Sequence, residues 1–234
     1  MKKVIVTTSW DDGHILDLKL VKLLNKYGLA GTLYVSPMDR EIEKSKLLTA
    51  KQIKSVMSKN IEIGAHTMTH PRVNAVTPIE ANKEIVESKA YLTKLTGKKV
   101  ISFCYPGGEY DPINVSQVKK AGYKMARTTK TFELSAGSNP FEIPTSVHAY
   151  DHYTDVFRIL TLVKFNPIKF MKLYLHWDNI AKELFDRALK DGGVFHLWGH
   201  SWEIDNHKDW ERLENVFKHI SKREGVKYVT NGEL

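Results

Sequence analysis

Two adjacent carboxylates stand on a glycine turn near the beginning of the chain. Asp11 and Asp12 precede Gly13 and follow the apolar run Val4–Val6, so they read as the C-terminal end of a first strand. Adjacent carboxylates repel each other. A chain keeps them together mainly where a cation, or a division of labour between a base and a ligand, offsets the repulsion. Because an Asx-turn or a helix N-cap would need only one of the two, the pair indicates a catalytic or metal-binding turn.

Two histidines four residues apart supply ligands that a cation at this turn would accept. The spacing of His66 and His70 predicts that both imidazoles lie on the same side of a helical turn, which Pro71 then ends. Two neutral imidazoles with one carboxylate form a facial site that leaves positions open for water and substrate, as hydrolytic zinc or another divalent metal requires. Histidines also cap turns or satisfy buried polar groups, so the spacing alone is weak evidence. Together with the carboxylate turn it favours a metal site.

A second pair of histidines comes late in the chain, where a buried strand ends. Parity puts His196 and His200 on one side of that strand, and one of them can be a hydrogen-bonded core histidine. His200 is nearer the strand end, so we assign it the active role. Trp198 and Trp202 are of a type that most often packs in a core or at a rim, but Trp202 is the better candidate to carry a sugar ring. No neighbour of Cys104 is placed to lower its pKa, so it reads as a small buried residue rather than a nucleophile.

Short β-branched or apolar runs alternate with longer amphipathic segments along the chain. The predicted strands are Val4–Ser9, Thr32–Ser36, Ile61–Ala65, Val100–Cys104, Tyr123–Arg127, Ile143–His148, Val194–Trp198 and Val226–Thr230. The predicted helices are Leu16–Tyr27, Thr49–Ser58, Pro78–Leu95, Val115–Ala121, Asp178–Lys190 and Trp210–Lys222. This alternation predicts an α/β fold with a parallel sheet, with Tyr150–Tyr174 as an excursion of helices.

The polar motifs favour a closed barrel over an open sheet. Each follows a predicted strand: Asp11 and Asp12, His66, the turn 105–108, Arg127, His148 and His200. A barrel gathers all such strand ends on one face. An open sheet would favour a phosphate loop after the first strand, and no glycine-rich phosphate motif stands there. We therefore predict a distorted (β/α) barrel of about seven parallel strands.

Bulk properties predict one domain, residues 1–234. The chain is 42% hydrophobic and 26% charged, with no linker or repeat. Its net charge of +8 is scattered, without the clustered stripe that nucleic-acid binding requires. The single cysteine rules out an internal disulfide. No apolar stretch approaches the length of a membrane span. The first strand begins at once, without a signal sequence, so a cytoplasmic location is expected.

At these residues the chain resembles the polysaccharide deacetylase family, carbohydrate esterase family 4, from Thr8 to the last strand. The stretch from Ser9 to Gly13 resembles the family's first motif. That resemblance implies that Asp11 is the general base and Asp12 a metal ligand. The stretch from His66 to His70 matches the second motif, whose two histidines are metal ligands.

Two further motifs complete the resemblance. The turn from Phe103 to Gly108 is similar to the motif whose backbone N–H helps to hold the oxyanion, which implies substrate contacts at Tyr105 and Gly107. The stretch that begins Gly199-His200 resembles the last motif, whose histidine is the general acid. The order and spacing of four motifs make the resemblance specific.

The chain departs from the family pattern at two positions. In many members an arginine that pairs with the catalytic aspartate stands where Cys104 does. We expect Arg127, at the end of the next strand, to supply this guanidinium, as in a subgroup that carries an arginine there. Many members also have an aromatic residue where Gly107 stands, which changes how the substrate is held.

These features predict a metal-dependent hydrolase that removes N-acetyl groups from an amino-sugar-containing substrate. One divalent metal is expected, with zinc as the first choice, and the same ligands would accept cobalt, iron or nickel. Two alternatives remain: hydrolysis of a non-sugar C–N amide bond at the same site, and a non-catalytic carbohydrate-binding barrel. The second is weakened because binding needs neither a base such as Asp11 nor an acid such as His200.

Overall fold

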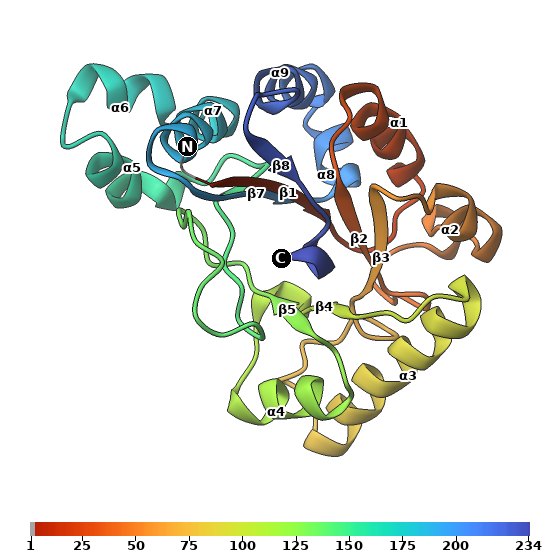
Figure 1. Ribbon diagram of the computed structural model, residues 1–234. Coiled ribbons are helices and arrows are strands. Elements are labelled where there is room, and N and C mark those ends of the chain that lie inside the picture. Colours follow the sequence, from red (N-terminus) through yellow and green to blue (C-terminus); the bar gives the residue numbers. More distant parts are fainter. Residues whose placement is uncertain (1–2) are drawn as a thin grey trace.

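Parallel strands form the centre of the protein in the computed structural model, which describes residues 3–234 (Figure 1). The strands are β1 (Val4–Trp10), β2 (Gly31–Val35), β3 (Ile61–Ala65), β4 (Ser102–Cys104), β5 (Met125–Arg127), β6 (Val147–His148), β7 (Gly193–Gly199) and β8 (Val226–Tyr228). Seven of them follow one path in the order β5-β4-β3-β2-β1-β7-β6, and β8 pairs with β1. Every pairing between these strands is parallel. The predicted α/β fold with about seven parallel strands is confirmed.

The sheet curls into a distorted barrel because β1 has three neighbours and the chain between β5 and β6 bridges the two edges. β1 pairs with β7 along its whole length, whereas β8 covers its first residues and β2 its last two. The N–H of Thr128 donates to Ile143 O over 2.9 Å, and the N–H of Ile143 donates to Ala126 O over 2.9 Å. The same segment then continues into β6, which pairs with β7. The strand ends therefore converge on one face, as a barrel requires.

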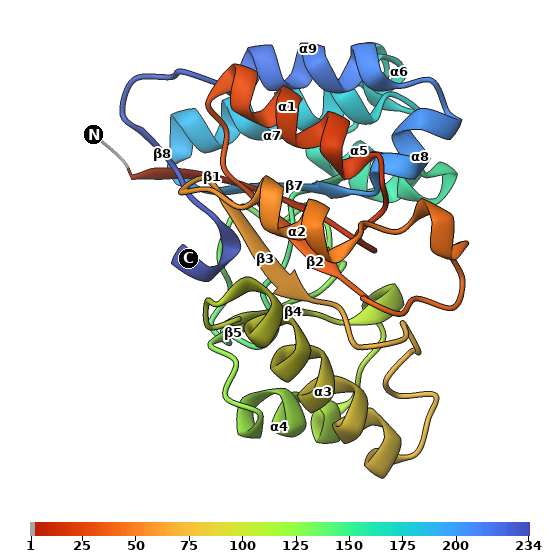
Figure 2. The same cartoon turned by 90° about the vertical axis from the view of Figure 1, so that its right-hand side faces the viewer.

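Helices cover the outside of the sheet. They are α1 (Asp17–Tyr27), α2 (Ala50–Val56), α3 (Pro78–Thr96), α4 (Pro112–Lys120), α5 (Val156–Leu162), α6 (Pro167–Leu173), α7 (Trp177–Asp191), α8 (Ser201–Asn206) and α9 (Trp210–Ile220). Figures 1 and 2 show α1, α7 and α9 packed together over β1 and β7, and α3 beside α4 outside β4 and β5. Among residues 3–234, no helix combines the length and the apolar character needed to cross a membrane.

Local sequence signals explain where the longest helix begins and ends. Thr77 caps the start of α3, because its hydroxyl accepts from the Glu80 N–H over 3.3 Å while the Glu80 carboxylate accepts from the Thr77 N–H over 3.0 Å. Pro78 occupies the first helical position, where no N–H is needed. Gly97 ends the helix with a left-handed φ of 69°. Residues Ala81, Ile85, Ser88 and Leu92 form its buried face.

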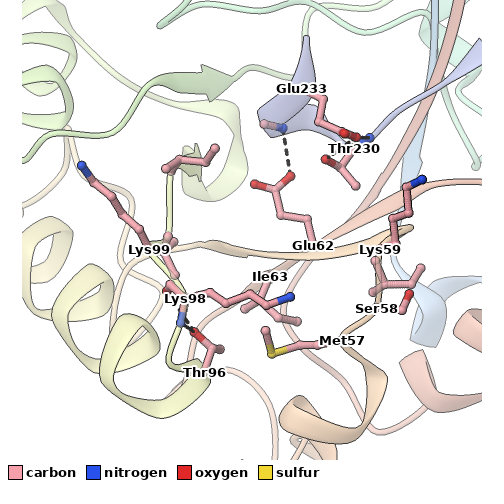
Figure 3. Close-up of a pocket in the computed structure, with 14 residues that line it drawn as sticks. Met57, Ser58, Lys59, Glu62, Ile63, Thr96, Lys98, Lys99, Thr230 and Glu233 are labelled. Carbon is pink, nitrogen blue, oxygen red and sulfur yellow. Dashed lines mark hydrogen bonds between the residues drawn. The ribbon is translucent and has the colours of Figure 1, made fainter.

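The C-terminal residues close the end of the barrel at which the strands begin. A short 3₁₀ turn, η4 (Asn231–Glu233), lies inside the ring of strands in Figure 1. The Asn231 amide accepts from the Thr7 hydroxyl over 2.8 Å and donates to the Tyr34 hydroxyl over 2.9 Å. The Gly232 N–H donates to Glu62 Oε2 over 2.9 Å, as Figure 3 shows. Beside η4 a pocket of about 240 Å³ is lined by residues that include Lys59, Lys98, Lys99 and Glu62.

Candidate active site

The carboxylate turn lies at the opposite end of the barrel, directly after β1. The Asp11 N–H donates to Gly199 O over 3.1 Å, which extends the pairing of β1 with β7 by one residue. Asp12 and Gly13 then both adopt the left-handed conformation, with φ values of 78° and 73°. A left-handed φ is uncommon outside glycine and often marks a functional site. A Cβ on Gly13 would lie 2.9 Å from Val35 Cγ1, so the turn also needs glycine for space.

The structure brings the three predicted metal ligands together. Asp12 Oδ1 lies 3.7 Å from His66 Nε2 and 3.4 Å from His70 Nε2. This oxygen is buried and has no hydrogen-bond donor among the described residues. The predicted helical turn is wrong, however, because residues 66–70 form an irregular loop in which Thr67 and His70 have φ values of 64° and 67°. The two imidazoles converge through this loop rather than through helical spacing.

Neighbouring groups orient both imidazoles. His66 Nδ1 lies 2.8 Å from Cys104 O, and His70 Nδ1 lies 3.0 Å from Glu41 Oε2. Because a carbonyl or carboxylate oxygen only accepts, each Nδ1 carries a proton and each Nε2 faces Asp12. Burial lowers the pKa of His66 to about 4, which keeps this imidazole neutral. An unpartnered carboxylate oxygen facing two imidazole nitrogens fits a divalent metal.

Arg127 lies against Asp11. Both side chains are buried, and Arg127 Nη2 donates to Asp11 Oδ1 in a close ion pair. Burial favours the neutral acid, but the Arg127 guanidinium, with smaller effects of His66 and His200, overcomes this and lowers the pKa of Asp11 to about 2. The guanidinium also lies 4.6 Å from the ring centroid of Trp198, a cation–π distance. The geometry matches the expectation that Arg127 replaces the guanidinium missing at Cys104.

Cys104 is fully buried at the end of β4, and burial raises the pKa of its thiol well above the usual value. A thiol held protonated is a poor nucleophile. This agrees with the interpretation of Cys104 as a packing residue.

His200 lies on the other side of the carboxylates, just before α8. Its Nδ1 is 3.0 Å from Glu203 Oε2, and its Nε2 is 4.0 Å from Asp12 Oδ2. Burial lowers the pKa of His200, but the hydrogen bond to Glu203 and the charges of Asp12 and Asp11 outweigh this effect and raise it to about 9. The imidazole is therefore protonated at neutral pH and able to give up a proton. His148 Nε2 lies 3.0 Å from the same Glu203 oxygen.

The other strand histidine is a core residue. His196 is 1% exposed, and its Nε2 lies 2.8 Å from the Ser9 hydroxyl. Burial, with a further effect of the Arg127 charge, lowers the pKa of His196 to about 3, so it is neutral. Its backbone N–H donates to the Ser146 hydroxyl over 3.0 Å. The structure thus separates the two histidines as expected, with His196 inside the sheet and His200 beside the carboxylates.

The predicted substrate residues Gly107 and Tyr105 differ in their exposure, because Gly107 lines a hollow and the Tyr105 ring is buried. Gly107 has a φ of 64° in a short turn, and it lines a hollow of about 260 Å³ with Trp198 and His148. The Tyr105 ring has no exposed surface, and its hydroxyl donates to Phe141 O over 3.1 Å. The ring is enclosed by the core, so the predicted substrate contact at Tyr105 could be made only by its backbone and stays a prediction. Only backbone groups of this turn remain available for such a contact.

Trp202 makes a contact that was not predicted from the sequence. Its indole N–H donates to Asp12 Oδ2 over 2.8 Å from the first turn of α8. This bond fixes the carboxylate so that its other oxygen faces the histidines. The arrangement makes Trp202 a residue that orients Asp12, and its predicted contact with a sugar ring stays a prediction.

The sequence analysis missed the roles of Glu41 and Glu203. Glu203 stands three residues after His200, a spacing that brings two side chains together at the start of a helix. A prediction of α8 would have found it. Glu41 lies in a loop far from His70 in sequence, and no local pattern identifies it.

Comparisons with known proteins agree with this geometry. A family model described as polysaccharide deacetylase matches residues 1–126. A peptidoglycan deacetylase from Helicobacter pylori is 24% identical over 243 residues, which cover 92% of this chain and 81% of that protein. The structure of a chitin deacetylase from Colletotrichum lindemuthianum has a TM-score of 0.60 at 16% identity, covering 100% of this chain and 88% of the other. This last similarity shows a shared fold.

One relative is considerably longer. A Bacillus subtilis protein assigned to the polysaccharide deacetylases is 28% identical over 130 residues. The match covers 55% of this chain and 45% of that protein, so the chain spans less than half of its length.

Proposed function

The chain belongs to the polysaccharide deacetylase family, and from this premise we propose that it is a metal-dependent hydrolase that removes N-acetyl groups from an amino-sugar-containing substrate. The observation that carries the proposal is the placement of Asp12 Oδ1, which is buried without a hydrogen-bond donor and faces two imidazole nitrogens. An ionised carboxylate and a protonated imidazole flank this group. Hydrolysis of an amide needs such a base and such an acid beside the reacting carbon.

Asp12, His66 and His70 are the residues that would hold the metal. A divalent metal bound there would polarise the amide carbonyl and lower the pKa of a bound water. Zinc is our first choice, because two neutral imidazoles and one carboxylate suit it well, and cobalt, iron or nickel would also be accepted. Glu41 and Trp202 orient the ligands from outside, and loss of such a partner commonly lowers metal affinity by about 10- to 100-fold.

Asp11 acts as the general base in this proposal. Arg127 keeps its carboxylate ionised, so it can accept a proton from the attacking water. The ion pair also fixes the carboxylate in position, because the buried guanidinium cannot move to another acidic group without exposing its charge. The developing oxyanion is held by a backbone N–H of the turn at Gly107.

His200 acts as the general acid. Its ring is held by Glu203 through Nδ1, which leaves Nε2 on the side of Asp12. A proton on Nε2 can therefore reach the nitrogen of the leaving amine. The shared carboxylate of Glu203 also contacts His148, so the acid and its partner belong to one connected group.

Two variants and a substrate panel test this proposal. The wild-type protein, purified without chelator, should contain about one divalent metal per chain and release acetate from N-acetylglucosamine oligomers. His66→Ala and His70→Ala should lose most of the metal and of the activity, while His219→Ala, far from the site on α9, should retain both. Equal metal content in all four proteins would refute the ligand set.

The panel also distinguishes the alternative substrate. Gly107 gives the turn no side chain with which to hold a sugar, and this favours an assay of cyclic imides and formamides beside the sugar oligomers. Activity on these amides alone would replace the amino-sugar substrate with a non-sugar C–N amide. Binding of oligomers without hydrolysis, by metal-loaded protein, would point to a carbohydrate-binding barrel.

A further inference from the structure

Exposed apolar side chains gather on one protruding part of the fold. We call residues 153–176, which contain α5 and α6, the α5–α6 arm. Six of the eleven exposed large apolar residues among the described residues lie in this arm. They are Tyr153 (76% exposed), Phe157 (81%), Phe165 (72%), Ile168 (70%), Met171 (69%) and Leu175 (43%). In Figure 1 the arm extends away from the sheet at the upper left.

The arm is also purely basic over most of its length. No aspartate or glutamate occurs between Val156 and Trp177. The same stretch holds Arg158, Lys164, Lys169 and Lys172, all exposed. The three lysines form no ion pair within the described part of the chain, whereas Arg158 lies 3.4 Å from Asp155. Unpaired cations beside exposed apolar side chains suit an anionic surface that has an apolar layer beneath it.

Exposed apolar and basic side chains stand next to each other along α6. Ile168 and Met171 are three residues apart, so they lie on one side of α6, and Leu173 is buried on another. Leu175 follows the end of the helix and is also exposed. Lys169 and Lys172 each stand next to one of these apolar residues.

The loop between the helices adds a further apolar side chain. Phe165 lies there with a φ of 58°, directly after Lys164 with a φ of 52°. Left-handed conformations are costly for such residues, and the loop nevertheless holds an exposed phenyl ring between two short helices. Next to α5 is a hollow of about 470 Å³, lined by Phe132, Phe157, Arg158, Thr161, Leu162 and Arg187. Its lining combines apolar groups with two guanidiniums.

We propose that the α5–α6 arm docks onto an anionic phospholipid surface. The apolar side chains enter the interface while the lysines stay at the level of the lipid phosphates, as in helices that lie on a membrane without crossing it. A second copy of this chain is a poor occupant, because it would bring lysine against lysine. An acidic glycan is also a poor occupant, because it offers no apolar layer to the exposed phenylalanines.

The arm begins shortly after β6, and its basic residue Arg158 lines the hollow of about 260 Å³ that also contains Gly107, His148 and Trp198. Docking through the arm therefore brings the face that carries the candidate active site close to the lipid surface. The proposal concerns the location of the protein and does not depend on the reaction that it catalyses.

Vesicle sedimentation tests the proposal with the full chain. Wild-type protein should bind vesicles of phosphatidylcholine mixed equally with phosphatidylglycerol much more tightly than vesicles of phosphatidylcholine alone. Raising the salt concentration should weaken this binding, because the charges of lipid and lysine are screened. The double variant K169Q/K172Q should weaken it on the order of tenfold. I168Q/M171Q should weaken it by a comparable factor, even at low salt.

Matched variants elsewhere control for general effects of charge and hydrophobicity. Lys51 and Lys54 are exposed on α2 with the same spacing, so K51Q/K54Q should bind like the wild type. Ile79 and Ile113 are exposed on α3 and α4, so I79Q/I113Q should also bind like the wild type. Circular dichroism confirms that each variant is folded. Equal loss in variants and controls, no binding to the anionic vesicles, or self-association without vesicle binding would each overturn the proposal.

Discussion

At the scale of single residues, the pair of Asp11 and Arg127 determines whether the site has a base. Both side chains are buried, so each charge depends on the other for its stability. The guanidinium comes from β5 and not from the strand that carries Cys104. Arg127 is farther from Asp11 in sequence than an arginine at position 104 would be, but it places the same positive charge next to the base.

Replacing Arg127 should impair the base. In Arg127→Met the pKa of Asp11 rises from about 2, because the charge that opposes the effect of burial is removed. The base works only when ionised, so the acidic limb of the kcat/KM profile should move to higher pH, and kcat should fall. Arg127→Lys retains a charge and should show a smaller shift. Unchanged profiles in Arg127→Met would leave Asp11 without its assigned partner.

Glu203 should control the opposite limb of the same profile. Its hydrogen bond helps to raise the pKa of His200 to about 9, so Glu203→Gln should lower that pKa. The acid works only when protonated, and the basic limb of kcat/KM should therefore move to lower pH. Glu211→Gln, an exposed change on α9, serves as the matched control. If only the thermal stability changed and the basic limb stayed in place, Glu203 would have a structural role alone.

The residue types of the site could be predicted from the sequence, but their partners could not. Asp12, His66 and His70 are recognisable because the carboxylate turn and the two histidines occur together, each directly after a predicted strand. The bond from Trp202 to Asp12 depends on two segments separated by most of the chain. No pattern within a short window contains that information.

At the scale of elements, all eight predicted strands exist, but β4, β5, β6 and β8 are shorter than predicted. β-branched runs buried on both sides give a strong signal, which explains this agreement. The helices at Leu16–Tyr27 and Trp210–Lys222 were recognisable by their apolar faces, and the structure confirms them as α1 and α9. α8 was not predicted, because Ser201–Asn206 is too short for a periodic pattern to appear.

α8 is anchored by a buried carboxylic acid on α1. The Ser201 hydroxyl donates to Asp17 Oδ1 over 2.6 Å, and Asp17 has no exposed surface. Burial raises the pKa of Asp17 to about 8, with a smaller contribution from the charges of Asp12 and Asp11. This bond links the start of α1 to the start of the helix that carries Trp202 and Glu203.

Asp17→Asn should make the stability less dependent on pH. Because the folded-state pKa is higher than the unfolded value of 3.8, the folded protein binds more protons between about pH 4 and 8. Its stability therefore falls as the pH rises through this range. Asparagine still accepts the bond from Ser201 but has no proton to lose. The free energy of unfolding of Asp17→Asn, relative to that of the wild type, should therefore rise over this pH range. Each realised unit of pKa shift corresponds to about 1.4 kcal/mol. A constant difference at all pH values would refute the protonation of Asp17.

At the scale of the whole molecule, the two ends of the barrel have separate tasks. The strand C-termini carry the proposed acid, base and metal ligands, while the N-terminal end is filled by η4. The sequence predicts the barrel because polar motifs follow many strands, but not how it closes. Closure depends on backbone bonds between residues 126–128 and 143, and on an asparagine that reaches back to β1 and β2.

Asn231 should therefore matter for stability and not for chemistry. The Asn231 amide forms hydrogen bonds with Thr7 and Tyr34 inside the barrel. Asn231→Ala leaves the buried Thr7 hydroxyl without a partner and the Tyr34 hydroxyl with only its bond to Met125 Sδ. The free energy of unfolding should fall by about 2 to 4 kcal/mol. The metal content and the pH profile of kcat/KM should stay as in the wild type, since the catalytic groups lie at the other end of β1. Asn82→Ala, at an exposed position of α3, should change neither property. A fall in metal content in folded Asn231→Ala would show that the two ends of the barrel are coupled. In that case η4 would be holding β1 and the carboxylate turn in position.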